Sequence, residues 1–178
     1  AIKMRNYTNC NKIRLISGPQ TCLFSKKIFE NFLKTEFTIT SSRDRMGIRL
    51  GHQGKKFDTK SGLNVLSEAI EIGDIQIDGQ GVPTILLNDR QPTGGYPRIA
   101  TVISADLHKV AQIGVNSTFK FTLVSLNEAI KALKDFTDEL SDLENEVFNL
   151  TRDPSDIDNL LSYGLIDGAI RGDEYEES

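Results

Sequence analysis

The sequence contains few of the residues that disulfide-rich domains and metal proteins need. Its 178 residues include no tryptophan, two cysteines and two histidines. Cys10 and Cys22 are too few for a disulfide framework and match no metal-ligand spacing, so we expect free thiols. Neither histidine has a second histidine or a cysteine at ligand spacing, so no metal site is predicted. We expect His52 in an exposed loop and His108 on the solvent face of a short helix.

Long apolar runs and a secretory leader are also missing. The apolar runs extend over only a few residues, and the opening AIKMRNYTNC has no apolar core of a signal peptide. We therefore expect a cytoplasmic protein without a membrane segment. The hydrophobic content of 38% is enough to bury a core of ordinary size, and the length favours one domain with an appendage.

Charge is distributed unevenly along the chain. Residues 1–134 carry 19 of the 21 lysines and arginines but 11 of the 25 acidic residues, while residues 135–178 carry the other two basic and 14 acidic residues. This pattern indicates an acidic element that docks on a basic surface. The basic residues are dispersed and not interleaved with aromatic ones, so nucleic-acid binding is not predicted. We predict a flexible segment at 1–11, a folded core at 12–134 and an acidic helical extension at 135–178.

Local patterns predict mainly short strands with a few short helices. Apolar residues alternate at 12–16, 36–40, 75–77 and 118–124, as in strands. The segment 84–87 is a further apolar run, and 99–104 is apolar on both faces, as in the core strand of a barrel or sandwich. Ser25 can cap a helix with one apolar stripe, Ser104 can cap a short helix, and Ser125 with Glu128 forms a capping box. These elements predict a β-barrel or a β-sandwich. From Leu126 to Leu150 apolar residues recur at alternating spacings of three and four, and we expect this helix to pack on a second one beginning at Asp153-Pro154.

The stretch LLNDRQPTGGYPRIATVIS, 86–104, interrupts two strands with a polar loop that core packing does not explain. Its two adjacent glycines allow positive φ and expose backbone N–H groups, which together with a nearby arginine can hold a carboxylate. A tyrosine adds an aromatic wall, and its bond to Pro97 can be cis. The alternative is a wide hairpin loop with solvated charges. The candidate binding residues are Asp89, Gln91, Gly94, Gly95, Tyr96 and Arg98, and Asp89 is the best catalytic candidate.

A second polar cluster lies at 41–47, with the sequence SSRDRMG. In an extended segment Arg43 and Arg45 fall on the same side, so two guanidinium groups can face one pocket. Arg45 therefore joins the candidate binding residues. The alternative is that each arginine forms a surface ion pair with a neighbouring carboxylate.

Three segments together resemble a known family. They are SSRDRMGIRL at 41–50, LSEAIEIGDIQI at 66–77 and LLNDRQPTGGYPRIATVISADL at 86–107. They are similar to the C-terminal half of the KipA family, also called allophanate hydrolase subunit 2 or the C subunit of 5-oxoprolinase, which is related to the carboxyltransferase domain of urea carboxylase. The resemblance runs from about residue 12 to 130, and it implies a cyclophilin-like β-barrel. Pro92 stands where the family has threonine in its QTTGGYP motif, which stiffens the loop.

The resemblance implies a partial subunit of a biotin-dependent carboxyltransferase, urea amidolyase-related or 5-oxoprolinase complex that binds a small amide or carboxylate. Expected partners are a KipI-like subunit, the A subunit of 5-oxoprolinase and the family's N-terminal half, whose features this chain lacks; a homo-oligomer stays open. We expect the chain to be inactive alone and to bind no cofactor itself, with ATP or carboxybiotin belonging to the full complex. Two alternatives remain, a non-catalytic KipA-like regulator of a KipI-like protein and a decayed gene fragment that still folds.

Overall fold

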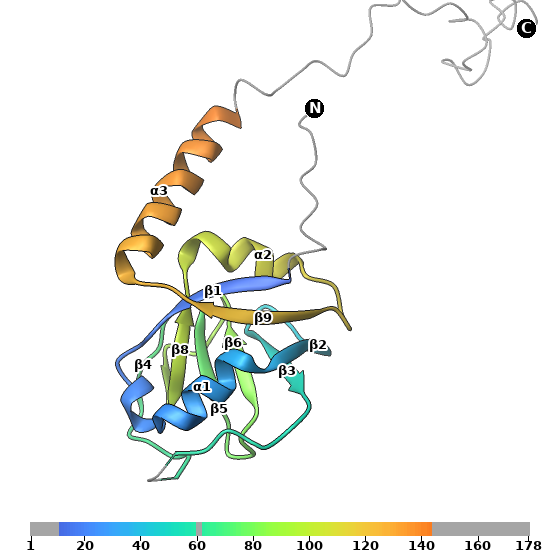
Figure 1. Cartoon of the computed structure of the whole chain (residues 1–178), viewed down its shortest axis with the longest axis vertical. Coiled ribbons are helices and arrows are strands. Elements are labelled where there is room, and N and C mark those ends of the chain that lie inside the picture. Colours follow the sequence, from blue (N-terminus) through green and yellow to red (C-terminus); the bar gives the residue numbers. More distant parts are fainter. Residues whose placement is uncertain (1–10, 60–61, 144–178) are drawn as a thin grey trace, which may run out of the picture. The chain divides into compact units, whose positions relative to one another are not determined.

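The computed structural model describes residues 11–59 and 62–143, and it shows a closed β-barrel with helices on its outside (Figure 1). Seven strands form the barrel in the order β1-β8-β5-β6-β3-β2-β9. A separate two-stranded ribbon pairs β4 with β7. The strands are β1 Lys12–Ile16, β2 Glu36–Arg43, β3 Gly47–His52, β4 Glu68–Ala69, β5 Asp74–Ile77, β6 Pro83–Leu86, β7 Thr93–Gly94, β8 Arg98–Val102 and β9 Thr118–Leu123.

The strand pattern left a barrel and a sandwich open, and the structure confirms the barrel that the family resemblance implied. Every strand pair in the barrel is antiparallel except β1 with β9, which are parallel, with Lys12 opposite Lys120 and Leu15 opposite Leu123. The β1–β9 pair closes the sheet, so each strand is paired on both sides and the barrel has no open edge.

The barrel interior is filled by alternate residues of the strands and by aromatic rings. Ile13, Leu15, Ile39, Ile48, Ile75 and Ile85 are completely buried in one apolar cluster. Phe32 joins this cluster from helix α1, Lys26–Lys34, and its ring centroid lies 5.1 Å from those of Phe37 and Phe121. A continuous aliphatic and aromatic core thus supports the barrel wall.

The predicted caps at Ser25 and Ser125 are present, but the one at Ser104 is wrong, because Ser104 lies inside a 3-10 turn and its side chain forms no cap hydrogen bond. The Ser25 side chain accepts a hydrogen bond from the Ile28 N–H at the start of α1. Ser125 and Glu128 form the predicted capping box of α3, Leu126–Ser141. After β8 come a 3-10 turn, Ser104–Asp106, and the short helix α2, Leu107–Gln112.

Helix α3 crosses the boundary that the sequence suggested after residue 134 and continues to Ser141. Its predicted apolar seam is divided between two faces. Ala129 packs on the Ile103–Ala105 region together with Ala132 and Phe136, whereas Leu126, Leu133 and Leu140 are exposed. A second compact unit combines residues 1–3 with 143–178 and lies almost wholly outside the described residues. The predicted flexible 1–11 segment, Asn11 excepted, and the second helix of the tail also lie outside the described residues.

Both histidines are more enclosed than the sequence suggested. His52 ends β3 instead of lying in a loop, and its ring packs on Phe57 with 4.8 Å between centroids. His108 is half-buried, because its ring stacks on Phe136 of α3 at 4.5 Å. Their predicted exposure is therefore wrong, since the Phe57 ring covers His52 and the Phe136 ring covers His108.

Asp106 joins β1 to the 104–112 region through a buried ionic cluster. Its carboxylate accepts hydrogen bonds from the Arg14 backbone N–H and guanidinium, at 2.7–2.9 Å, and from Lys109 Nζ at 2.6 Å. Burial opposes ionisation of Asp106, but these hydrogen bonds outweigh it and hold the pKa of the carboxyl below its ordinary value of 3.8. The ionised form is thus favoured in the folded chain.

We expect Asp106→Asn to lower the free energy of unfolding by about 1–3 kcal/mol at neutral pH, because charge-assisted hydrogen bonds are lost. A carboxyl with a lowered pKa contributes stability above its unfolded-state pKa, and this contribution disappears as pH falls through the folded value. Urea unfolding of both proteins should therefore show a difference that persists down to about pH 4 and shrinks below it. A difference that stays constant under acid conditions would contradict an electrostatic origin.

Candidate functional site

A row of polar side chains crosses the wall of the barrel on three neighbouring strands. Gln76 on β5 is opposite Thr84 on β6, and Thr84 is in turn opposite Arg49 on β3. Their neighbours along the strands, such as Ile75 and Ile48, are buried in the core. Because side chains alternate across a strand, the three polar residues face outward. They form the floor of a pocket.

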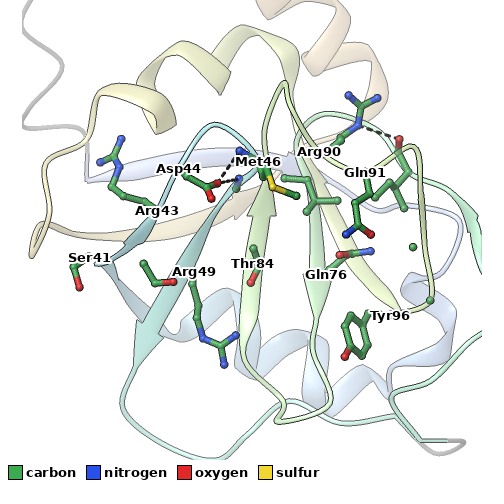
Figure 2. Close-up of a pocket in the computed structure, with 16 residues that line it drawn as sticks. Ser41, Arg43, Asp44, Met46, Arg49, Gln76, Thr84, Arg90, Gln91 and Tyr96 are labelled. Atoms are coloured by element: carbon green, nitrogen blue, oxygen red, sulfur yellow. Dashed lines mark hydrogen bonds between the residues drawn. The ribbon is translucent and has the colours of Figure 1, made fainter.

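Two loops raise the walls of this pocket, which has a volume of about 600 Å³ (Figure 2). The β2–β3 end supplies one wall, and the segment after β6 supplies the other, as the side chains in Figure 2 show on either side of Thr84 and Gln76. Both walls combine polar groups with apolar surface. The lining residues from these walls are Ser41, Ser42, Arg43, Asp44, Met46, Gly47, Arg90, Gln91, Gly94, Gly95 and Tyr96, and Ile70 and Leu86 also line the pocket.

The three arginines that line the pocket already bind protein acceptors. Arg43 donates to the Ile113 and Ala111 carbonyls, at 2.6 and 2.7 Å, near the C-terminus of α2. Arg90 donates to the Ile70 carbonyl at 3.0 Å and to Glu71 at 3.1 Å. Glu71 thus offsets the charge of Arg90, while the carbonyls occupy donors of Arg43 and leave its charge in place.

Arg49 is held at the pocket floor by an acidic turn. It forms an ion pair with Asp78 and donates to the Gln80 side chain at 3.2 Å. Burial raises the pKa of Asp78, but the Val82 and Gln80 N–H groups, together with Arg49, outweigh it and hold that pKa below its ordinary value. Asp78 therefore stays ionised at neutral pH and fixes the guanidinium in place.

The structure divides the predicted binding residues into three groups: residues that line the pocket, a surface ion pair and one buried arginine. Gln91, Gly94, Gly95 and Tyr96 line the pocket, but Arg45, Asp89 and Arg98 are not among its lining residues. The two glycines do not form the expected turn, because Gly94 belongs to β7 and pairs with Glu68, and neither has positive φ. The Tyr96–Pro97 bond is trans.

Arg45 and Asp89 bind one another on the surface. Arg45 Nε lies 2.9 Å from Asp89 Oδ2 and Nη2 lies 3.2 Å from Oδ1, and the Arg45 side chain is 85% exposed. The Asp89 N–H also donates to the Arg45 carbonyl at 3.0 Å. This pair joins the two pocket walls, which corresponds to the surface ion-pair alternative considered for the 41–47 cluster.

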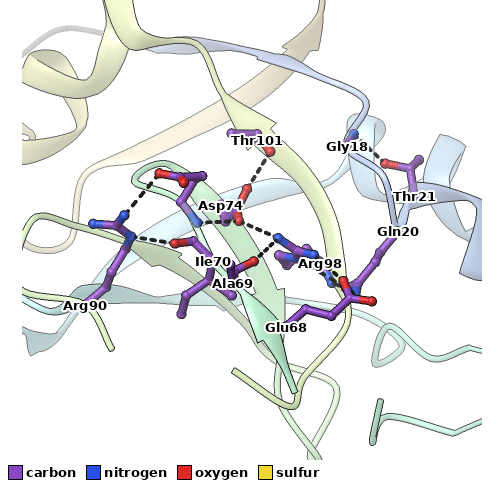
Figure 3. A network of polar contacts seen from close by, with 11 residues as sticks. Gly18, Gln20, Thr21, Glu68, Ala69, Ile70, Asp74, Arg90, Arg98 and Thr101 are labelled. Atoms are coloured by element: carbon purple, nitrogen blue, oxygen red, sulfur yellow. Dashed lines mark hydrogen bonds and ion pairs between the residues drawn. The ribbon is translucent and has the colours of Figure 1, made fainter. Parts of the chain in front are cut away.

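Arg98 lies in a buried network beneath the β4–β7 ribbon (Figure 3). Its guanidinium donates to Glu68 at 2.8 Å, Asp74 at 3.2 Å and the Ala69 carbonyl at 2.8 Å. Gln20 accepts from the Arg98 backbone N–H at 2.9 Å. Because Ala69 pairs with Thr93, this network anchors the strand that forms one pocket wall.

Several pocket residues escaped prediction, among them Arg49, Gln76 and Thr84. Each sits inside a strand, where an outward polar residue normally indicates only a solvated face. The sequence contained one signal for this floor: two polar residues, Gln76 in IQI and Thr84 in TIL, stand at opposing positions of a hairpin. Their relation to the two polar loops depends on tertiary structure.

Within residues 11–59 and 62–143, no group of three or more potential ligands is arranged to hold a metal ion. Over the same part of the chain, no helix is long and apolar enough to cross a membrane.

The described residues thus combine a closed barrel with a two-loop pocket on its outer wall. The model of the carboxyltransferase domain, subdomains A and B, matches residues 2–123, and the chain therefore belongs to this family. The C subunit of the Haemophilus influenzae 5-oxoprolinase is 44% identical over 119 residues, which are 67% of this chain and 38% of that protein. Its Escherichia coli counterpart is 38% identical over 125 residues, 70% of this chain and 40% of that protein.

The fold also resembles a solved structure. The urea amidolyase of K. lactis superposes with a TM-score of 0.68 at 24% identity, covering 79% of this chain and 9% of that protein. This similarity supports the barrel fold. By the shares given above for the two C subunits, the chain spans about two fifths of the length of the curated relatives it matches.

Proposed function

We propose that this chain supplies the binding pocket for a small amide or carboxylate within a larger 5-oxoprolinase or biotin-dependent carboxyltransferase assembly. One observation carries the proposal: the outward row Arg49, Thr84, Gln76 is enclosed by the same two polar loops that carry the family resemblance. Ordinary outward strand residues face solvent, whereas these face a cavity with apolar and polar walls. The names of the curated relatives make 5-oxoproline the first ligand to test.

The rest of the assembly is part of the same proposal. A KipI-like subunit, the A subunit of 5-oxoprolinase or a KipA-type N-terminal half would complete the active site. The three pocket arginines are already bound to protein acceptors, which leaves a poor surface for a triphosphate. ATP or carboxybiotin therefore belongs to other parts of the assembly in this proposal.

A non-catalytic role as a KipA-like regulator is the second candidate, and the environment of Asp89 favours it. Both carboxylate oxygens of this catalytic candidate contact Arg45, and Asp89 does not line the pocket. A general base needs an oxygen within reach of the substrate. The described barrel thus offers binding groups more clearly than a reactive one.

Titration with 5-oxoproline, followed by NMR of the backbone amides, tests the pocket. We expect shifts at Gln91, Gly94 and Gly95, because these amides belong to the pocket wall. Cyclopentanecarboxylate keeps the ring and carboxylate, and 2-pyrrolidinone keeps the ring amide, so each should bind more weakly than 5-oxoproline. Shifts confined to residues outside the pocket, or no shifts at millimolar ligand, would contradict the proposal.

Ring opening of 5-oxoproline by the mixed assembly separates the two candidates. The chain alone should be inactive, and activity with ATP should require the KipI-like and A subunits together with the N-terminal half. Turnover by the chain alone would contradict its role as one part of a larger enzyme. If the complete mixture stays inactive while the chain still binds its partners, the regulatory role is favoured.

A further inference from the structure

The side-chain amide of Gln76 is an exception among the polar groups of the pocket. Gln76 Nε2 is buried and has no hydrogen-bond partner among the described residues. The three pocket arginines, Arg43, Arg49 and Arg90, by contrast have protein partners. A buried N–H group without a partner is unfavourable, so its retention calls for an explanation.

The Gln76 side chain lines the pocket, and its amide nitrogen is buried against the pocket wall. Gly94 lies directly beside it, and a Cβ atom on Gly94 would come within 2.3 Å of Gln76 Nε2. The same Cβ would contact Ile70 at 3.4 Å, so the amide lies next to apolar surface. Gly94 has no positive φ, and its lack of a side chain therefore provides space instead of backbone freedom.

From this arrangement we infer that Gln76 is a specificity-determining residue, whose Nε2 donates a hydrogen bond to a carbonyl or carboxylate oxygen of the ligand. The inference rests on the proposed function, since it names a contact within that pocket. Ile70 and Leu86 also line the cavity near the floor. A ligand whose oxygen accepts from Nε2 therefore carries a hydrocarbon part next to that oxygen, which contacts these two side chains. A cyclic amide such as 5-oxoproline has this combination, whereas urea lacks the hydrocarbon.

The opposing explanation is that Gln76 only supports the fold. In that case its replacement by a side chain of similar length would destabilise the barrel. If Nε2 instead awaits a ligand, Gln76→Met removes an unpaired buried donor and keeps most of the packing volume. The free protein should then melt at the same temperature as the wild type or higher.

The main experiment measures ligand affinity and thermal stability for the wild type and Gln76→Met. We expect the dissociation constant for 5-oxoproline to rise about tenfold, with no fall in melting temperature. Gln53→Met is the matched control, because Gln53 is exposed and lies outside the pocket. It should bind like the wild type. Comparing 2-pyrrolidinone with cyclopentanecarboxylate then shows whether the ring carbonyl or the carboxylate accepts the hydrogen bond.

Gly94→Ala provides a second arm. The added methyl group should displace the end of the flexible Gln76 side chain and weaken binding, while the melting temperature changes little. Gly95→Ala is its neighbour and control, since a Cβ there has only an ordinary contact, 3.5 Å from the Val65 carbonyl. It should weaken binding less than Gly94→Ala.

The outcomes separate the two proposals. Equal binding by the wild type and Gln76→Met would overturn the role of Gln76 and leave the pocket intact. A clear loss of melting temperature in Gln76→Met would also overturn it, by showing a structural role. No binding of any of the three probes by the wild type would overturn the proposed pocket, and the role of Gln76 with it.

Discussion

Replacing Arg98 by alanine should lower the free energy of unfolding by about 3–5 kcal/mol, because it leaves a buried carboxylate without its cation. Asp74 is the main group affected, since its side chain is 5% exposed and that of Arg98 is 9% exposed. Gln20 Oε1 and the Ala69 carbonyl lose their guanidinium donors in the same change, whereas Gln20 keeps the hydrogen bond from the backbone N–H of residue 98. Chemical denaturation of the two proteins measures the difference.

Arg45→Ala is the matched control for this experiment. The Arg45 side chain is 85% exposed and pairs with a carboxylate that is itself 44% exposed, so its loss should cost at most about 1 kcal/mol. Equal effects of the two substitutions would contradict the structural role of Arg98. An Arg98→Ala protein that stays stable but no longer binds 5-oxoproline would instead support the sequence prediction that Arg98 holds the ligand.

Phe32→Ala should cost about 3–5 kcal/mol, because it removes a completely buried ring and leaves a cavity. Phe32 contacts Phe37, Phe57 and Phe121, with ring centroids 5.1–5.3 Å apart. It thereby connects α1 to the barrel interior. Urea unfolding should show an earlier midpoint with little change in slope.

Phe29→Ala tests whether burial causes the effect of Phe32→Ala. Phe29 lies on the same helix but is only partly buried at the edge of the core. The same atoms are removed, so it should cost clearly less. If Phe29→Ala were as destabilising as Phe32→Ala, loss of helix stability would explain both results better than a core cavity.

The barrel could be predicted because its strands carry local signals, but β3 could not. The alternation around Phe119 and Phe121 and the cap at Ser125 depend only on neighbouring residues. In contrast, β3 contains Gly47 and Gly51, which weaken a strand pattern. Gly47 is required by tertiary contact, since a Cβ there would lie 2.8 Å from the Ile85 carbonyl. No local rule reveals that contact.

The candidate site likewise contains residues that local sequence marks and residues whose place depends on tertiary contacts. Gln91 and Tyr96 belong to a polar loop that the sequence marks as unusual, and the pocket includes them. Arg45 and Arg98 look alike in sequence, yet one is exposed and the other is enclosed by Gln20, which lies 78 residues away. Gln76 has an ordinary strand context. Its role depends on which loop covers the strand, and this is decided by long-range packing.

The parallel pairing of β1 with β9 also constrains how the barrel can form during synthesis. Lys12 reaches its partner Lys120 only after more than one hundred intervening residues have been made, and Leu15 waits for Leu123. The entropy cost of closing so long a loop arises before the contacts between β1 and β9 can stabilise the chain, and this slows folding. Until β9 leaves the ribosome, β1 and β2 each lack a neighbour. The nascent barrel thus has two unpaired strand edges until β9 is available, and this is the stage at which a chaperone or an assembly partner would protect it from wrong strand pairing.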